Sequence, residues 1–235
     1  MKAVSTLPLA LALLAPTLLA AEPNTLTPEE KEQGFELLFD GKSLDGWRTF
    51  REEEPRAQWK VVDGTITLTE GGGGDLITKE EFGDFDFRCE WKIVSGGNSG
   101  IIWRSTEEHN YPWVSGPEYQ ILDSFPSPTH KYPHEIEAKN LAGGLYALKS
   151  AKPEWSKPAG EWNEARLVIQ GTRITLYLNG TVTADVDSTT DEFKEMLSKS
   201  KFNGWEHFNK AKQGHIALQD HGDTVSFRTV RLRKL

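Results

Sequence analysis

Asn98-Ser-Gly-Ile-Ile-Trp-Arg104 and Gly116-Pro-Glu-Tyr-Gln-Ile-Leu-Asp123 are the two stretches that decide the fold of this chain. Successive side chains of a β-strand point to opposite faces of the sheet, so each stretch has one apolar face suited to a core. The opposite face carries Arg104 in the first stretch and Glu118 and Gln120 in the second. The sequence therefore predicts two strands of a sheet whose polar face binds a polar ligand.

The same alternation continues along most of the chain, and turn signals separate the runs. Asp63-Gly64 joins two runs that we expect to pair as a hairpin. The predicted strands cover residues 35–39, 59–62, 65–69, 75–78, 84–94, 98–104, 116–123, 145–148, 164–170, 173–178, 181–185, 215–221 and 225–232. So many short strands with little helix indicate an all-β sandwich of two antiparallel sheets. Two short helices are expected, one capped by Thr27 and one inserted near residues 190–201.

Composition narrows the possible functions. Lys and Arg total 27 against 35 Asp and Glu, a net charge of -8, and no basic block offers a footprint for phosphates. Nucleic acid is therefore not an expected partner. The single cysteine, Cys89, lies within a predicted strand, so no intrachain disulfide can form and a buried, inert thiol is expected. The length of 235 residues suits one β-rich domain.

The first 21 residues are predicted to be a signal peptide. Lys2 precedes an apolar run over residues 7–19, which is shorter than the roughly twenty residues that a spanning helix needs. We expect a lead-in over residues 22–33 and one sandwich domain over 34–235. No cysteine follows the apolar run as a lipoprotein anchor, so the mature protein is expected in the periplasm or outside the cell, without a membrane anchor. The oligomeric state is left open.

The closing strand adds residues to the polar face. The isoleucine and leucine of residues 215–221 must point to the core, so Gln219 and His221 point the other way. The same argument adds Tyr146. Asp220 lies beside His221, and a neighbouring carboxylate is what fixes an imidazole tautomer.

Each of these residues also has an ordinary structural explanation. Arg104 and Glu118 fit a simple cross-strand ion pair on a solvated face. Asp123 points to the opposite face of the strand from Glu118, so it is expected to brace a loop. A retaining glycosidase needs two carboxylates on one face, and this strand therefore fits that mechanism poorly. The loop at residues 126–140 is expected to border the polar face, and residues 202–208 to lie near it.

No metal or cofactor is predicted. The irregular spacing of His109, His130, His134 and His207 matches no metal-binding motif. The four glycines at 71–74 lack the Lys and the following helix of a phosphate-binding loop, so they are expected to be a strand connection.

Several motifs occur in the order seen in the 3-keto-disaccharide hydrolase family, and the chain resembles that family from about Gly34 to Leu235. The motifs are Phe35-Glu-Leu-Leu-Phe-Asp-Gly-Lys-Ser-Leu-Asp-Gly-Trp47, the two opening stretches, Gly160-Glu-Trp-Asn163, Leu178-Asn-Gly180, Gly214-His-Ile-Ala-Leu-Gln-Asp-His-Gly222 and Val225-Ser-Phe-Arg228. The resemblance implies a concanavalin A-like jelly-roll sandwich whose concave sheet binds sugar. It also implies activity on glycosides that already carry a ketone at C3.

The implied chemistry suggests a role for each polar residue. A C3 ketone acidifies the C2 proton, so a base can form an enolate that expels the glycosidic oxygen, and water then adds back. Under this resemblance His221 is the general base or acid, Glu118 is its complement, and Arg104 stabilises the enolate. The residues expected to bind substrate are Gln120, Gln219, Tyr146, Asn98, Trp103 and Trp113.

Three other functions remain open from the sequence. The same fold hosts non-catalytic, lectin-like carbohydrate-binding modules, and fold alone does not choose between binding and catalysis. An ordinary glucanase of this fold is a second alternative. The predicted positions of Glu118 and Asp123 on opposite faces of the strand argue against it. A domain that serves only protein contacts is a third, for which the sequence offers no exposed apolar stripe or charge block.

Overall fold

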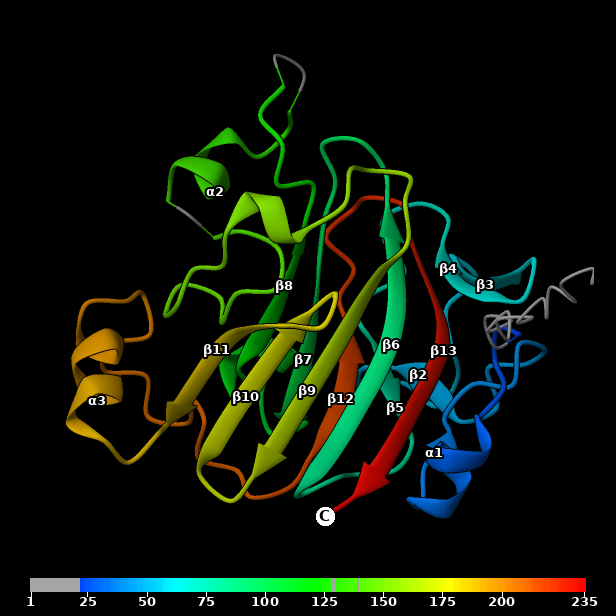
Figure 1. The fold of residues 1–235 in the computed structure, drawn as a ribbon, viewed down its shortest axis with the longest axis horizontal. Coiled ribbons are helices and arrows are strands. Elements are labelled where there is room, and N and C mark those ends of the chain that lie inside the picture. Colours follow the sequence, from blue (N-terminus) through cyan, green and yellow to red (C-terminus); the bar gives the residue numbers. More distant parts are fainter. Residues whose placement is uncertain (1–21, 128–129, 139) are drawn as a thin grey trace, which may run out of the picture.

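The computed structural model describes residues 22–127, 130–138 and 140–235. Two antiparallel sheets make up this part of the chain (Figure 1). The large sheet has the strand order β11-β10-β9-β6-β13-β4-β3, with β1 beside β13, and the small sheet has the order β2-β5-β12-β7-β8. The predicted jelly-roll sandwich of two antiparallel sheets is confirmed. The segment predicted as a signal peptide lies outside the described residues.

The strands are short, as the turn signals predict. Those of the large sheet are β1 (Glu36–Leu37), β3 (Trp59–Val62), β4 (Thr65–Leu68), β6 (Phe85–Ile93), β9 (Asn163–Gln170), β10 (Arg173–Leu178), β11 (Thr181–Asp187) and β13 (Val225–Lys234). Those of the small sheet are β2 (Trp47–Thr49), β5 (Leu76–Thr78), β7 (Asn98–Ser105), β8 (Glu118–Leu122) and β12 (His215–Leu218). The hairpin predicted at Asp63-Gly64 forms between β3 and β4.

One predicted strand is wrong. Residues 145–148 form only isolated bridges, from Leu145 to Tyr119 and to Lys149. The chain turns back on itself here, with the Leu148 and Lys149 amides both donating to the Leu145 carbonyl oxygen. Local turn hydrogen bonds therefore replace a ladder.

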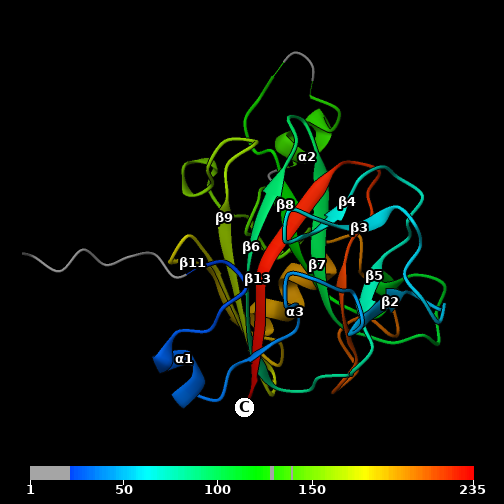
Figure 2. The ribbon, with the colours of Figure 1, turned by 90° about the vertical axis from the view of Figure 1, so that its right-hand side faces the viewer.

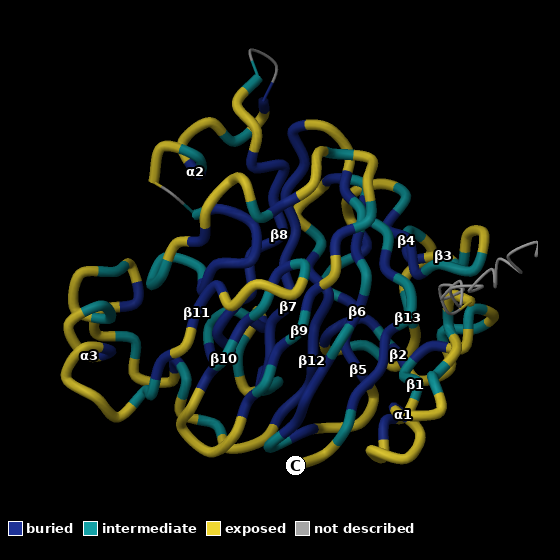
Figure 3. Tube along the Cα trace, viewed as in Figure 1, coloured by how far each residue is buried: buried dark blue, intermediate teal, exposed yellow. Residues whose placement is uncertain are grey.

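The core lies between the two sheets, which stand side by side as layers in Figure 2. On β6 the alternate residues Phe85, Phe87, Cys89 and Trp91 are buried, and the small sheet contributes its own apolar face, including Ile101. Figure 3 shows this burial along the strands, with exposed residues concentrated in the outer loops. Cys89 is fully buried, and burial raises the pKa of its thiol, so the expectation of an inert thiol is confirmed.

The helices lie outside the two sheets. They are α1 (Pro28–Glu32), α2 (Pro133–Glu137) and α3 (Asp191–Ser198), with single 3₁₀ turns at Pro112–Val114 and Pro153–Trp155. Thr27 caps α1 through the predicted capping box, and Thr190 caps α3 by accepting from the Phe193 amide. Within the described ranges, no helix is long and apolar enough to cross a membrane.

The outer face of the small sheet carries a second, smaller apolar cluster. Ile77, Ile102 and Ala217 are buried there beneath Phe50, and Trp113 packs against them. These residues come from β5, β7 and β12 and from the loops that cross the sheet. They form the floor on which the polar residues of this face are placed.

Candidate active site

A cavity of about 240 Å³ opens on the outer face of the small sheet, and we call it the Glu118 cavity. Its lining comes from β7, from β8, from the segment that follows β12 and from the loops above them. The lining residues are Asn98, Trp113, Gly116, Glu118, Gln120, Tyr146, Lys201, Phe202, Gln219 and His221. The structure thus brings together the residues predicted for the site, with the exceptions of Arg104 and Trp103.

Glu118 lies at the floor of this cavity and is only 7% exposed. Its Oε2 accepts from Gln219 Nε2 at 3.4 Å, and the Gln120 amide donates to Oε1 at 3.1 Å when its nitrogen faces the carboxyl group. Burial raises the pKa of Glu118 to about 8, against the opposing charge of Lys201. Glu118 is therefore mostly a neutral carboxylic acid at pH 7, able to donate a proton.

Gly100 on the neighbouring strand β7 makes room for this carboxyl group. The two residues are diagonal neighbours in the β7–β8 pairing, in which Gly100 is aligned with Gln120 and Ile102 with Glu118. A Cβ on Gly100 would lie 2.4 Å from Glu118 Oε1. Because Gly100 of the stretch 98–104 has no side chain, it leaves free the space that the Glu118 carboxyl group occupies.

Lys201 supplies the positive charge of the cavity. It follows α3, and its Nζ lies 4.1 Å from the centre of the Tyr146 ring, a cation–π contact. Burial lowers the pKa of Lys201, while the carboxyl groups of Glu118 and Glu135 raise it. This lysine was not among the residues predicted from the sequence. Its one signal was its position directly before the aromatic segment 202–208, of which Phe202 lines the cavity as expected.

The loop that the sequence places beside the polar face does border it. Glu135 on α2 accepts from the Tyr146 hydroxyl at 3.1 Å and from Asn140 Nδ2 at 2.7 Å. Burial raises the pKa of Tyr146, and the nearby carboxyl groups add to the effect. Tyr146 therefore enters the cavity as a neutral hydroxyl whose orientation is set by α2.

His221 is exposed at the rim, where the Tyr132 hydroxyl contacts both its ring and its backbone. The Tyr132 hydroxyl donates to the His221 carbonyl oxygen at 3.2 Å and also lies 3.2 Å from His221 Nδ1. When the single hydroxyl proton is donated to the carbonyl oxygen, Nδ1 of the neutral imidazole donates the second hydrogen bond and Nε2 keeps a free lone pair. Asp220 was predicted to orient this imidazole, but that prediction is wrong: its Oδ2 accepts from the Gly72 and Gly74 amides at 2.9 Å.

Two buried oxygens in the cavity receive no hydrogen bond. Asn98 Oδ1 and Gln219 Oε1 belong to side chains only 3% and 8% exposed, and no donor from the described residues reaches either atom. A buried acceptor without a donor is costly, by about 1–3 kcal/mol. Hydroxyl groups of a sugar are donors of the kind that would satisfy both.

Aromatic side chains form one wall of the site. Trp113 stacks on Tyr111 with ring centres 5.0 Å apart and planes 10° apart, and Trp205 lies 5.8 Å away on a tilt. Such a surface suits the apolar face of a pyranose ring. Trp103, the other predicted platform, is 0% exposed in the core, so that prediction is wrong. Its strand parity had already placed it on the core face.

Arg104 lies away from the cavity, and the prediction that it shares this face is wrong. Its guanidinium donates to the carbonyl oxygens of Gly83 and Gly171 at 3.1 and 3.0 Å and to Asp84 Oδ1 at 2.8 Å. The pairing of β7 with β12 shifts between His215 and Ala217, and Arg104 has a positive φ of 52°. A β-bulge of this kind redirects a side chain and breaks the alternation on which the prediction depended.

Arg104→Ala is therefore expected to lower stability. The substitution removes the Arg104 donors to two carbonyl oxygens and one of the two donors to Asp84 Oδ1, which should reduce the free energy of unfolding by about 2–4 kcal/mol. Urea denaturation measures this loss. Arg173→Ala is the matched control, because its ion pair with Asp185 is exposed, and we expect a change below about 1 kcal/mol. Equal losses in the two variants would contradict the role given to Arg104.

A second carboxylate faces the same side of the sheet. Asp75 precedes β5 and lines an adjoining cavity of about 340 Å³, the Asp75 cavity, which shares Trp113, Gln219 and His221 with the Glu118 cavity. Burial raises the pKa of Asp75 to about 6. Asp75 was not predicted as a site residue, although it is two positions from Ile77 and so shares the outer face of the sheet with it.

Asp123 takes the structural role that the sequence predicts. Its Oδ2 accepts from the Gly96 amide at 2.8 Å, and its carbonyl oxygen lies 2.6 Å from His130 Nε2. The prediction that Asp123 braces a loop is confirmed.

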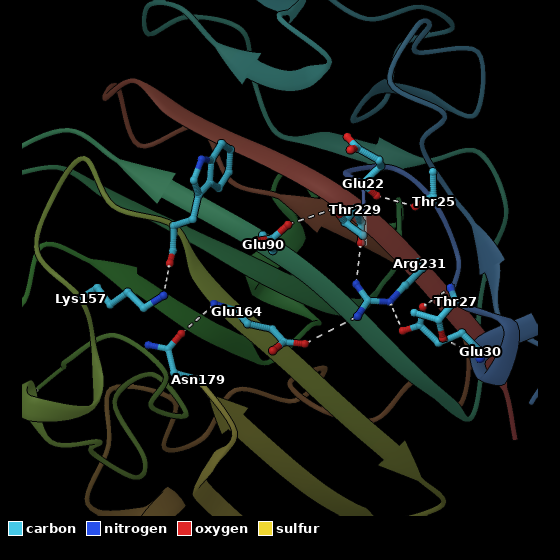
Figure 4. A pocket seen from close by; sticks show the side chains of 11 residues that line it. Glu22, Thr25, Thr27, Glu30, Glu90, Lys157, Glu164, Asn179, Thr229 and Arg231 are labelled. Atoms are coloured by element: carbon cyan, nitrogen blue, oxygen red, sulfur yellow. Dashed lines mark hydrogen bonds and ion pairs between the residues drawn. The ribbon is translucent and has the colours of Figure 1, made fainter. Parts of the chain in front are cut away.

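A larger cavity, of about 520 Å³, lies on the outer face of the large sheet (Figure 4). Several of its charged groups are paired with one another: Arg231 Nε donates to Glu30 at 2.6 Å, and the Arg231 guanidinium lies 3.6 Å from Glu164. The Thr229 hydroxyl donates to Glu90 at 3.0 Å. These pairs anchor the N-terminal segment to the sheet, so size alone does not mark this cavity as the site.

Fold and site together define a β-sandwich protein with a polar, sugar-sized cavity on the outer face of its small sheet. Residues 34–233 match the profile of the 3-keto-alpha-glucoside-1,2-lyase-like domain, and the chain belongs to this family. The resemblance seen in the sequence motifs is confirmed.

The chain is similar to several known proteins. A 3-keto-disaccharide hydrolase of Bacteroides thetaiotaomicron is 30% identical over 247 aligned residues, which cover 93% of this chain and 84% of that protein. A crystal structure from Parabacteroides distasonis, described as a candidate glycosyl hydrolase, is 28% identical with a TM-score of 0.80, covering 91% of this chain and all of that one. A second structure from the same organism, described in the same way, is 24% identical with a TM-score of 0.65, covering 86% and 99% of the two chains.

Proposed function

We propose that this chain cleaves the glycosidic bond of sugars that carry a ketone at C3. The observation that carries the proposal is the buried carboxyl group of Glu118 beside Lys201, in a cavity whose unpaired acceptors suit sugar hydroxyls. Family membership and the name of the B. thetaiotaomicron relative support the choice of substrate.

The proposed reaction begins with removal of the C2 proton. His221 Nε2, which has a free lone pair, takes this proton, and Lys201 stabilises the negative charge that develops on the ketone oxygen. Lys201 thereby replaces Arg104 in the role first expected of an arginine. Glu118, neutral at pH 7, protonates the glycosidic oxygen as the C1–O bond breaks. One base, one cation and one acid are enough for elimination.

The remaining lining residues position the sugar. Asn98 and Gln219 accept hydrogen bonds from hydroxyl groups, Gln120 and Tyr146 offer further polar contacts, and Trp113 stacks on the ring. Their hydrogen-bond partners within the protein hold several of these groups in place before substrate arrives, which lowers the entropic cost of binding.

The test compares 3-keto-glucosides with the same glucosides unoxidised. We expect release of the leaving group from the 3-keto compounds alone. Binding of sugar without turnover would instead indicate a lectin-like module. Asp75 and Glu118 on one sheet face also favour a second candidate, an ordinary two-carboxylate glycosidase, and hydrolysis of the unoxidised glucosides would support that candidate and refute the proposal.

Trp113→Ala is expected to weaken substrate binding more than catalysis. Loss of the stacking surface should raise KM for a 3-keto-glucoside about tenfold and leave kcat within about threefold, because stacking contributes similarly to ground state and transition state. Steady-state kinetics measure both constants. Trp162→Ala, on the opposite sheet against Lys92 and Arg228, is the control and should change neither. A fall in kcat alone for Trp113→Ala would contradict the platform role.

We also propose that the chain is exported, on the strength of the apolar run after Lys2. Cell fractionation with N-terminal sequencing tests this. The mature protein should begin near Glu22 in the exported fraction, and an intact Met1 in the cytoplasm would refute export.

A further inference from the structure

We infer that Asp75 is the base that activates the water molecule that adds to C1 once the leaving group has departed. The Asp75 cavity is then the place where the leaving group, and after it the water, is bound. This inference rests on the proposed function and assigns to the same site the second half of a hydrolysis. It predicts a complete hydrolase rather than a protein that stops at elimination.

The carboxylate of Asp75 is fixed at one oxygen and free at the other. Oδ1 accepts from the Asp220 amide at 2.9 Å, and Asp220 is itself held by the amides of the glycine run 71–74. No residue in the described part of the chain donates to Asp75 Oδ2. An oxygen that is held in place and open to the cavity is the arrangement that a base for water requires.

The two cavities meet, so one substrate can occupy both. Trp113, Gln219 and His221 line each of them, and Gln219 donates to Glu118 while its own Oε1 lacks a donor. The charge of Asp75 also raises the pKa of Glu118, which places the two carboxyl groups within electrostatic reach of each other. A sugar in the Glu118 cavity can therefore project its C1 substituent toward Asp75.

The chemistry balances without a further reagent. Elimination removes the C2 proton, breaks the C1–O bond and forms a C1=C2 double bond conjugated with the C3 ketone, releasing the leaving group as an alcohol. In the second step the water oxygen bonds to C1, Asp75 accepts a proton from that water, and the double-bond electrons move toward the ketone. His221 then returns a proton to C2, which gives the 3-keto sugar, and the proton that Asp75 took from water passes through solvent to Glu118, which gave its own proton to the leaving group. Ionised Asp75 is available at pH 7, because its pKa is about 6.

The direct test supplies the unsaturated 3-keto sugar itself and follows the loss of its ultraviolet absorbance. Wild-type protein should hydrate it, and Asp75→Asn should be at least about a hundredfold slower. Asp45→Asn, in an exposed loop, is the matched control and should behave as wild type. Absence of hydration by the wild type, or equal rates in Asp75→Asn, would overturn the inference. This assay contains no glycosidic bond, so its outcome is independent of whether glycoside cleavage is found.

A second measurement separates a chemical role from a structural one. With a 3-keto-glucoside, Asp75→Asn should accumulate the unsaturated sugar while release of the leaving group falls far less than hydration. Added formate should restore hydration by Asp75→Ala at least about tenfold, because a small carboxylate can enter the space of the missing side chain. A loss of release that is largest for poor leaving groups would make Asp75 the leaving-group acid, and no rescue by formate would make it a structural residue; either overturns the inference.

Discussion

Glu118→Gln is expected to reduce kcat on a 3-keto-glucoside at least about a thousandfold at pH 7, because it removes the proton that the leaving oxygen needs. The size and hydrogen-bonding capacity of the side chain are retained, so KM should change little. The loss should shrink for substrates with a good leaving group, such as a nitrophenyl 3-keto-glucoside, which departs without help from an acid. Steady-state kinetics with both substrates measure the difference.

The same residue predicts how activity depends on pH. Glu118 must be protonated to act as the acid, and its pKa is about 8, so wild-type kcat should fall as pH rises through about 8. The remaining activity of Glu118→Gln should lack this fall. The exposed Glu161→Gln is a matched control whose profile should follow the wild type. A wild-type profile that rises through pH 8 would show that Glu118 acts as a base instead.

Stability should move with pH in a related way. Burial raises the pKa of Glu118 from 4.5, the ordinary value expected in the unfolded chain, to about 8. Its stabilising contribution is therefore complete below about pH 4.5 and is lost as pH rises toward 8, at roughly 1.4 kcal/mol per pH unit. The glutamine of Glu118→Gln does not titrate. As pH rises between these values, the free energy of unfolding of the variant should therefore increase relative to that of the wild type. Urea denaturation at pH 5 and pH 8.5 measures the gain, and an equal difference at both would contradict the raised pKa.

Lys201→Met should reduce kcat about a hundred- to a thousandfold, the usual cost of losing one group that stabilises a developing oxyanion. Methionine keeps most of the length and packing against Tyr146 but removes the charge. Lys201→Arg restores a cation of different shape and should recover part of the loss. Kinetics of the three proteins on a 3-keto-glucoside separate these effects.

The control for Lys201 is Lys199→Met, since Lys199 is exposed at the end of α3 and pairs with Glu195. That variant should keep wild-type activity. Wild-type kcat in Lys201→Met would remove Lys201 from the mechanism and leave the ketone oxygen without the cation proposed for it.

The fold could be predicted because alternation reports burial locally. In β6 each apolar residue is two positions from the next, so the sequence alone indicates which face of that strand enters the core. The hairpin at Asp63-Gly64 and the cap at Thr27 depend on neighbours only a few residues away. These features were confirmed.

The site could be predicted only in part. Glu118, Gln120, Gln219 and His221 followed from parity within single strands, and the structure does place them around one cavity. Arg104 failed because a bulge depends on how β7 pairs with β12, and nothing in the stretch 98–104 reports that pairing. The prediction of a strand at 145–148 was wrong for a similar reason, because a strand needs a neighbouring strand to pair with and the local sequence does not report one.

The sequence by itself determined the sandwich, the polar face and the family motifs, because each of these depends on residues that are close together along the chain. Only the tertiary structure decided that Asp75, Lys201 and Glu135, from three distant segments, join Glu118 in adjoining cavities or beside them. It also decided the protonation of Glu118, because burial and the charges of those three residues set the pKa together. The two opening stretches thus supply the floor of the site, and the loops folded over them supply the charges that define its chemistry.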